Sequence, residues 1–414
     1  MQISRQRYTP NDVGPSPLEW SAPQLSQVSE LITNGFVGTA SPFYTDESGV
    51  PYLYGSNVRP NRIELSGVRY ITHEFHEQEA KTSLKCGDLL MVQSGHIGET
   101  AVVPKELEGA NCHALIVTRP RKDLVHPDYL SHYINSEIGR ARLKGLEVGS
   151  TILHINTKDL KKFRVLLPPL SEQKKIARIL STWDQASNTV EKLISNSKQQ
   201  KTALAQSLLD GTKRLPGFAD PWNYQRASDI FYPISTRNNS ANEVLLAVTQ
   251  DQGILPRSLL ERRVVMPEGD TTSYKLVRPG NFVISLRSFQ GGLEHSKFRG
   301  IVSPAYTVIA AKKDISSDFY RHYFKSYNFI GHLAVAVVGI RDGKQISYGD
   351  FSFLKLPCPP IPEQEKIAEI LNIADREIEI LQEKLACINK ERKALVQQLL
   401  TGKRRVMIDK LEFA

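Results

Sequence analysis

The chain has 414 residues, a formal net charge of +9 at pH 7 and 40% hydrophobic residues. This length exceeds that of one ordinary domain, so we expect at least two packed units with cores of their own. No apolar stretch approaches the roughly 18 residues that a membrane span needs, and no apolar segment follows the first basic residues as in a secretory signal. These features exclude a membrane protein and favour a soluble, cytoplasmic one. The positive charge permits a polyanionic partner but does not require one.

The sequence shows no sign of a catalytic or metal centre. Its four cysteines are widely spaced, which predicts neither a disulfide framework nor a zinc site: Cys86, Cys112, Cys358 and Cys387. The stretch HEFH at 73–76 has its histidines three apart instead of the four of a zinc-protease helix, so we expect ordinary surface residues there. There is no GxxxxGK[ST] phosphate loop and no Asn/Asp-Pro-Pro-Tyr/Phe stretch, which is typical of DNA amino-methyltransferases.

Residues 1–167 are predicted to form a first globule. Strand-like runs at 89–93 and 114–118 and a helical pattern at 127–144 indicate a mixed α+β structure. This globule also contains three polar segments with glycine: YGSNVR at 54–59, QSGH at 93–96 and GST at 149–151.

Residues 168–214 begin PPLSEQKKIARIL and are predicted to form one long helix. The double proline stops any preceding element, and Ser171 suits a helix N-terminus. Gly211 stands where a left-handed residue would end the helix, and basic residues follow it. A heptad seam with a polar middle runs along the segment: Ile176, Leu180, Trp183, Ser187, Val190, Ile194, Ser197, Lys201, Leu204 and Leu208.

Residues 215–358 are predicted to form a second α+β globule that faintly repeats the first. GDLLMV at 87–92 is echoed by GNFVIS at 280–285, and DYLSHY at 128–133 is echoed by DFYRHY at 318–323. Strand-like runs and one helical pattern recur in the same order, at 282–286, 306–310 and 318–335. Polar, glycine-containing segments recur as well, at 249–253, 287–292 and 339–345.

Residues 359–405 repeat the first long helix at an offset of 191 positions, with 17 identities in 47 positions, and residues 406–414 form a tail. A lone helix of this length, roughly 60 Å, must bury its apolar stripe, and the other copy is the obvious partner. Both seams contain a basic residue, Lys201 or Arg392, whose stem we expect to snorkel to the seam edge. The second seam consists of Ile367, Leu371, Ala374, Ile378, Leu381, Leu385, Ile388, Arg392, Leu395 and Leu399.

The paired Pro-Pro-x-x-Glu-Gln-x-Lys-Ile-Ala-x-Ile-Leu segments, each followed by a long helix ending in Leu-Leu-x-Gly-x-x-Arg, resemble the specificity subunit of type I restriction–modification systems. The resemblance covers nearly the whole chain. It implies that 1–167 and 215–358 are target-recognition domains, separated by two conserved spacer helices, 168–214 and 359–405. The helices would pack as an antiparallel coiled coil in a pseudo-two-fold arrangement.

The resemblance also implies the partners. Two methyltransferase subunits, which methylate adenine with S-adenosylmethionine, would dock on the chain, and restriction subunits that use ATP and Mg would join them. The specificity subunit itself would catalyse nothing and hold no cofactor. Ten seam residues are the expected scaffold for this assembly: Ile176, Leu180, Leu204, Leu208, Ile367, Leu371, Leu381, Leu385, Leu395 and Leu399.

Base edges are read mainly by Arg, Asn, Gln, Lys, Ser and Thr, often from loops opened by glycine. Polar glycine loops are also commonly plain turns, and Arg and Lys would mostly contact phosphates. In the first globule the candidate DNA-binding residues are Ser56, Asn57, Arg59, Gln93, Ser94, His96, Ser150 and Thr151. In the second globule they are Thr249, Gln250, Gln252, Arg287, Ser288, Gln290, Arg341, Lys344 and Gln345.

These features predict a non-catalytic, sequence-specific reader of double-stranded DNA. Two modules reading one face of B-DNA lie about one helical turn apart, roughly 34–36 Å, and rigid helices hold such a distance better than a flexible linker. Because the two globules differ in detail, the target should be asymmetric and bipartite. Two alternatives remain open: the DNA-recognition part of a single-chain restriction–modification enzyme, and a coiled-coil scaffold without DNA contact.

Overall fold

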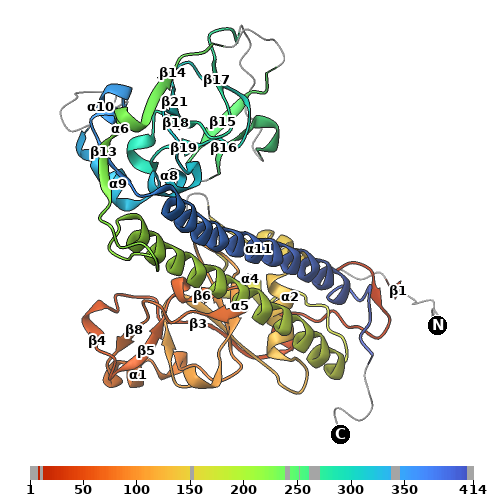
Figure 1. Ribbon diagram of the computed structural model, residues 1–414. Coiled ribbons are helices and arrows are strands. Elements are labelled where there is room, and N and C mark those ends of the chain that lie inside the picture. The colour runs from red at the N-terminus through yellow and green to blue at the C-terminus, as the bar shows by residue number, and fades with distance from the viewer. Residues whose placement is uncertain are drawn as a thin grey trace. The chain divides into compact units, whose positions relative to one another are not determined.

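The computed structural model describes residues 8–9, 13–149, 153–237, 243–250, 252–260, 271–336 and 346–407. The chain forms two compact units (Figure 1). Unit 1 contains residues 1–191 and 383–414, and unit 2 contains residues 192–382. Each unit therefore holds one globule and part of both long helices, so the units divide within the helices and not at their ends.

Unit 1 is built around a four-stranded antiparallel sheet with the order β10-β9-β12-β3. These strands are β3 Ser29–Asn34, β9 Leu89–Val92, β10 Thr100–Val102 and β12 Leu115–Pro120. A second sheet has the order β11-β5-β8-β4, and its strands are β4 Tyr44–Thr45, β5 Val50–Leu53, β8 Arg69–Ile71 and β11 Asn111–Cys112. Two short pairs join β1 Tyr8–Thr9 to β2 Ser16–Pro17 and β6 Val58–Arg59 to β7 Arg62–Ile63.

The helices of the first globule are short. The α-helices are α1 His73–Gln78, α2 Pro127–Asn135, α3 Glu137–Lys144 and α4 Thr157–Leu160. The 3₁₀ turns are η1 Leu25–Gln27, η2 Ser41–Phe43, η3 Gly55–Asn57, η4 Ala80–Thr82 and η5 Lys105–Leu107. The helical pattern expected at 127–144 is thus split in two, because Ser136 caps α3 by accepting a hydrogen bond from the Gly139 amide.

Unit 2 has an antiparallel sheet with the order β14-β21-β18-β19. Its strands are β14 Phe231–Ile234, β18 Phe282–Ile284, β19 Glu294–His295 and β21 Thr307–Ala311. Three strand pairs flank it: β13 Asn223–Arg226 with β22 Lys355–Cys358, β15 Leu246–Thr249 with β16 Gly253–Pro256, and β17 Lys275–Val277 with β20 Gly300–Val302. The helices are α6 Ala227–Ile230, η6 Arg257–Leu259, α7 Ser288–Gly291, α8 Ser317–Tyr323, α9 Tyr327–Ala336 and α10 Tyr348–Ser352.

The main sheets of the two units follow the same plan. Each sheet has four antiparallel strands, and the order of the strands across the sheet is the same in both when they are numbered along the chain. The strands β3, β9, β10 and β12 therefore correspond to β14, β18, β19 and β21. A helix pair, α2–α3 or α8–α9, follows the last of these strands. The predicted α+β class, the internal repeat and the predicted strands are therefore confirmed, with strand ends shifted by one or two residues.

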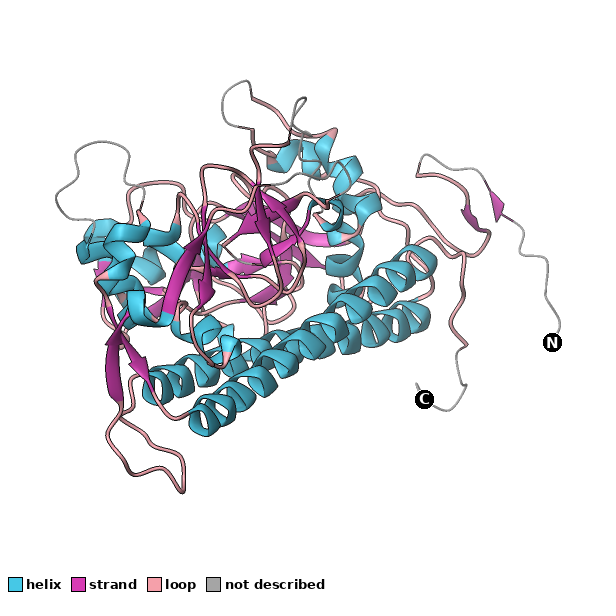
Figure 2. Cartoon of the chain, turned by 45° about the horizontal axis from the view of Figure 1, so that its top comes forward, coloured by secondary structure: helices cyan, strands magenta, loops and turns pink. Residues whose placement is uncertain are grey.

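The long helices are α5 Leu170–Leu209 and α11 Ile361–Leu399, which lie side by side (Figure 2). They pack antiparallel, because later residues of α5 contact earlier residues of α11. The Ser187 hydroxyl donates to the Asn389 side-chain oxygen over 3.1 Å in unit 1. In unit 2 the Ser197 hydroxyl donates to Glu377 over 3.2 Å. Every residue of the two predicted seams is buried or half-buried, which confirms the seams. Gly211 and Gly402 both have positive φ, 75° and 70°, as predicted for residues that end these helices.

The glutamate of the repeated Glu-Gln pair forms a buried ion pair in each unit. In unit 1, Arg405 makes a bidentate ion pair with Glu172, with N–O distances of 2.7 and 2.9 Å, and the Trp20 indole donates to the same carboxylate over 3.2 Å. In unit 2, Arg214 binds Glu363 in the same way, with both distances 2.8 Å. Both glutamate side chains are 0% exposed. The arginine after one long helix is thus bound to the first turn of the other.

The glutamine of the pair anchors the neighbouring loops. The Gln173 side chain donates to the backbone carbonyls of Pro168 and Leu124 over 2.8 and 3.0 Å and accepts from the His126 amide over 2.9 Å. In unit 2 the Gln364 side chain makes two of these bonds, accepting from the Ser316 amide over 3.0 Å and donating to the Pro359 carbonyl over 2.8 Å. Both glutamines are buried. The Glu-Gln pair that occurs in both copies of the repeat is therefore explained by buried polar contacts at the start of each long helix.

We predict that Arg405→Ala lowers the free energy of unfolding by about 3 kcal/mol, because it leaves the Glu172 carboxylate buried without its charge partner. Urea unfolding of the full chain measures this effect. The double variant Arg405→Ala/Glu172→Gln removes the stranded charge and should recover at least half of the loss. Equal destabilisation of the single and double variants would contradict an electrostatic cause.

Candidate nucleic-acid interface

The loop at 54–59 of unit 1 is held by one of its own candidate residues. The buried Asn57 side chain accepts from the Tyr54 amide over 2.9 Å and donates to the Glu64 carbonyl over 2.9 Å. Ser56 is exposed. Arg59 is half-buried, with its guanidinium 3.6 Å from the Glu64 carboxylate. In this arrangement Asn57 fixes the turn, while Ser56 and Arg59 are at or near its surface.

The candidate segment at 93–96 lies against residues 154 and 155 of the same unit. The Gln93 carbonyl accepts from the Ile155 amide over 3.3 Å, and Ser94 forms an isolated β-bridge with His154. The Gln93 side chain donates to the Asn34 side chain over 3.1 Å. The His96 side chain is 74% exposed. Ser150 and Thr151 lie outside the described residues.

In unit 2 the structure brings two separately predicted loops together. The Gln250 side chain donates to the Arg287 carbonyl over 3.1 Å, which joins the β15–β16 turn to the start of α7. Within the turn, the Thr249 hydroxyl donates to the Gly253 carbonyl over 2.9 Å and accepts from the Gln252 amide over 3.0 Å. The side chains of Gln250, Gln252 and Arg287 are exposed.

The remaining candidates of unit 2 differ in their environment. Ser288 is buried, and its hydroxyl accepts from the Ser285 amide over 2.8 Å, so it holds the turn before α7. Gln290 is exposed. Arg341, Lys344 and Gln345 lie outside the described residues.

One residue that organises these loops was not among the candidates. The Lys325 ammonium donates to the carbonyls of Gln250 and Gly291, over 3.4 and 2.9 Å, and pairs with the buried Glu294 carboxylate. It lies between α8 and α9, in a stretch without the glycine signal of a loop. The internal repeat was the one sequence signal that could have drawn attention to Lys325. When DYLSHY is aligned with DFYRHY, position 325 corresponds to Asn135 of unit 1.

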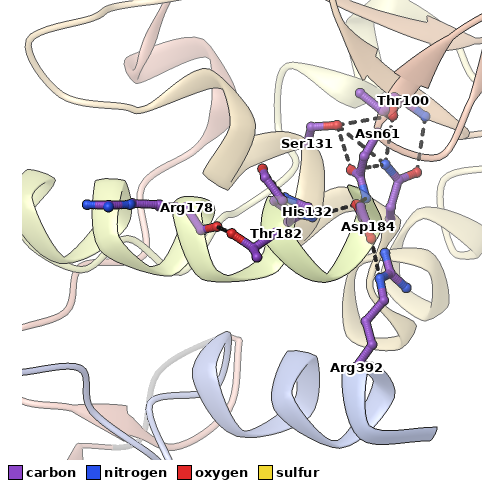
Figure 3. A network of polar contacts seen from close by, with 10 residues as sticks. Asn61, Thr100, Ser131, His132, Arg178, Thr182, Asp184 and Arg392 are labelled. Atoms are coloured by element: carbon purple, nitrogen blue, oxygen red, sulfur yellow. Dashed lines mark hydrogen bonds and ion pairs between the residues drawn. The ribbon is translucent and has the colours of Figure 1, made fainter. Parts of the chain in front are cut away.

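An ion pair joins the two long helices within each unit. Arg392 of α11 pairs with Asp184 of α5 in unit 1 (Figure 3), and Lys201 of α5 pairs with Asp375 of α11 in unit 2. Asp184 and Asp375 occupy equivalent repeat positions, as do Lys201 and Arg392. Both basic side chains are half-buried, and each reaches a carboxylate on the opposite helix, a partner that the expectation of stems snorkelling to the seam edge did not include.

A buried histidine from each globule lies beside this ion pair. His132 of α2 has Nδ1 3.7 Å from the Asp184 carboxylate and Nε2 3.2 Å from the Ser181 hydroxyl. His322 of α8 has Nε2 2.9 Å from the Asn372 side-chain oxygen. Burial lowers the pKa of His132 to about 4; Arg392 adds to this effect and Asp184 opposes it. Burial, reinforced by Arg321, also lowers the pKa of His322 to about 4, so both imidazoles are neutral at pH 7.

We predict that the protein loses stability as the pH falls from about 6.5 to about 4. In this window the unfolded histidine takes up a proton that folded His132 does not, which amounts to up to about 3 kcal/mol for one histidine at the lower end. His132→Gln should therefore flatten the dependence of the unfolding free energy on pH. His96→Gln, at an exposed position of the same unit, is the control and should leave it unchanged. Parallel curves for wild type and His132→Gln would contradict the assignment.

Two kinds of feature are absent from the described residues. In the described part of the chain, no group of three or more His, Cys, Asp or Glu side chains is arranged to hold a metal ion. The same residues include no helix long and apolar enough to cross a membrane. The described residues do include exposed polar loops, and these loops lie on two similar folds.

Comparison with known proteins identifies the class. The family model of the type I restriction modification DNA specificity domain matches residues 17–197 and, a second time, residues 225–390. The chain therefore belongs to this family. It is the DNA specificity subunit of a type I restriction–modification system, a subunit that is non-catalytic and carries no cofactor of its own.

Individual relatives agree with this family, one of them over almost its whole length. The chain is 26% identical to the putative type I restriction enzyme MjaX specificity subunit of Methanocaldococcus jannaschii, over 97% of each protein. It is 32% identical to the type I restriction enzyme EcoKI specificity subunit of Escherichia coli K12, over 40% of this chain and 37% of the relative. The crystal structure of the type I S subunit from M. genitalium shares the fold, with a TM-score of 0.59 and 14% identity over 92% of this chain and 96% of that one.

Proposed function

We propose that the two globules, 1–167 and 215–358, are target-recognition domains that read the two halves of an asymmetric, bipartite site in double-stranded DNA. The observation that carries this proposal is that the two units share the strand order of their main sheet but differ in their polar loops. The same strand order supports a 3₁₀ turn at 55–57 in unit 1 and a hairpin, β15–β16, in unit 2. Equivalent scaffolds with different polar loops are suited to read different sequences.

The proposed DNA contacts come from the members of these loops that are exposed or half-buried. Amide and hydroxyl side chains would reach base edges, and the arginines would contact phosphate or guanine. Asn57 and Ser288 are left out of this set, because both are buried and hold turns. The retained residues are Ser56, Arg59, Gln93, Ser94, His96, Thr249, Gln250, Gln252, Arg287 and Gln290.

The long helices, 168–214 and 359–405, would serve as spacer and docking site. Most of each segment is one uninterrupted helix, α5 or α11, which supports a rigid spacer between the recognition domains. In unit 2, Ile373 and Ile380 lie seven residues apart on α11 and are 62% and 55% exposed, so they offer an apolar stripe for a partner helix. The proposed partners are two methyltransferase subunits and the restriction subunits, which would bring S-adenosylmethionine, ATP and Mg and would act in the cytoplasm.

A domain exchange tests the modular reading. Replacing residues 215–357 with the corresponding domain of another specificity subunit should change one half of the methylated motif and leave the other half as it was. Single-molecule sequencing of methylated host DNA measures the motif. A change in both halves would refute independent reading by the two globules.

A charge substitution separates DNA reading from a scaffold without DNA contact. Arg287→Ala should weaken binding of the complex with its methyltransferase subunits to target DNA, and if Arg287 contacts a phosphate the slope of log K against log salt should fall by about 1. The matched control is Lys355→Ala, an exposed basic residue on β22 outside the proposed loops. If the wild-type complex gives no specific gel shift with target DNA, the scaffold without DNA contact is favoured. Methyl transfer by the isolated chain would favour a single-chain enzyme.

A further inference from the structure

A polar network in unit 1 leads from the proposed recognition loop to the long helices. Asn61 follows the 54–59 loop directly, at the turn between β6 and β7, and has a left-handed backbone with φ 62°. Its side-chain amide donates to the Asp184 carboxylate of α5 over 3.0 Å (Figure 3). The other oxygen of Asp184 binds Arg392 of α11. One side chain therefore joins the base of the loop to the interhelical ion pair.

The same side chain is held from the opposite direction by α2. The Asn61 side-chain oxygen accepts from the Ser131 hydroxyl over 2.9 Å and from the Asn135 amide over 2.8 Å. The backbone amide of Asn61 donates to the Thr100 carbonyl over 2.9 Å. Both lone pairs of the oxygen are thus used. Asn61 is half-buried, so its side chain is committed to these contacts and is not presented to a ligand.

Unit 2 makes a link of the same kind with different residues. By the echoed motif, Arg321 and Lys325 stand at the positions of Ser131 and Asn135. The Arg321 guanidinium lies 3.4 Å from Asp375, the equivalent of Asp184. Lys325 donates to the carbonyls of two loop residues, Gln250 and Gly291. In unit 1 these two positions hold Asn61, which itself bonds the spacer aspartate, whereas in unit 2 Arg321 contacts the aspartate directly and Lys325 contacts the loops.

We propose that these side chains are positioning residues for DNA recognition. Asn61, with Ser131 and Asn135, fixes the first recognition loop to the interhelical ion pair, and Arg321 with Lys325 does so for the second. The network orients the loops without touching DNA. A displacement between α5 and α11 would reach the loops through Asp184 or Asp375. This inference rests on the proposed function of the globules.

Asn61→Gly isolates the effect in unit 1. Glycine adopts a φ of 62° without strain, so the turn is kept while the bonds to Asp184, Ser131 and Asn135 are lost. The probe is duplex DNA containing the motif found by methylome sequencing, and two further duplexes have one half-site substituted. The measured quantity is the ratio of dissociation constants, substituted to intact, for the complex with its methyltransferase subunits.

The expected result is a fall of about tenfold in this ratio for the first half-site, comparable to one mismatched base pair, with the ratio for the second half-site unchanged. The matched control is Asn156→Gly in the same unit, which loses two side-chain hydrogen bonds at the start of α4 outside the network. It should lower the melting temperature without changing either ratio.

A second variant repeats the test in unit 2. Lys325→Met/Glu294→Gln removes the ammonium without leaving a buried carboxylate unpaired, and it should lower the ratio for the second half-site only. If Asn61→Gly does not fold, Ser131→Ala, which removes the single bond to Asn61 and one to the Thr100 carbonyl, should shift the first ratio by a smaller factor.

The outcomes separate the inference from the function beneath it. Folded variants with wild-type ratios, or with ratios equal to those of Asn156→Gly, would overturn the positioning role and leave the proposed function standing. A wild-type complex that does not distinguish intact from substituted half-sites would overturn the proposed function itself.

Discussion

The pairing of the two long helices is the constraint on which the rest of the structure depends. Each helix has a continuous apolar seam that is unstable in water unless it is covered. The seams are buried or half-buried along both helices, and their ends are closed by the bidentate pairs Arg405–Glu172 and Arg214–Glu363. Because each of these glutamates lies in the first turn of a helix and each arginine follows the other helix, neither unit is complete with one helix alone. The globules are built onto this frame.

Most of the frame could be predicted from the sequence, because its signals are local. The double prolines, the heptad spacing and the glycines at 211 and 402 define the long helices, and the echoed motifs predict the repeated sheet. The partners of the seam cations could not be predicted, since they lie far away along the chain: Lys201 and Asp375 are 174 residues apart, and Arg392 and Asp184 are 208 apart. Such pairings become apparent only when the antiparallel register is known.

The roles of single residues in the candidate loops were harder to predict, for a physical reason. Asn and Ser in glycine loops can read bases, but they also cap turns with the same donor and acceptor atoms. Asn57 and Ser288 do the latter, and their burial is set by packing from distant elements. Lys325 was missed because its role depends on three backbone and side-chain acceptors from elsewhere in unit 2. Composition therefore located the loops, whereas the roles of single side chains required coordinates.

The discontinuity of unit 1 bears on how the protein is made. Unit 2 is one uninterrupted stretch, 192–382, whereas unit 1 combines the first 191 residues with residues 383–414. A chain that emerges from the ribosome N-terminus first supplies everything unit 2 contains before it supplies Arg405, the partner of Glu172. The globule that is translated before the other is therefore completed after it, and the nascent chain keeps the first half of α5 without its α11 partner until residues 383–399 have been made.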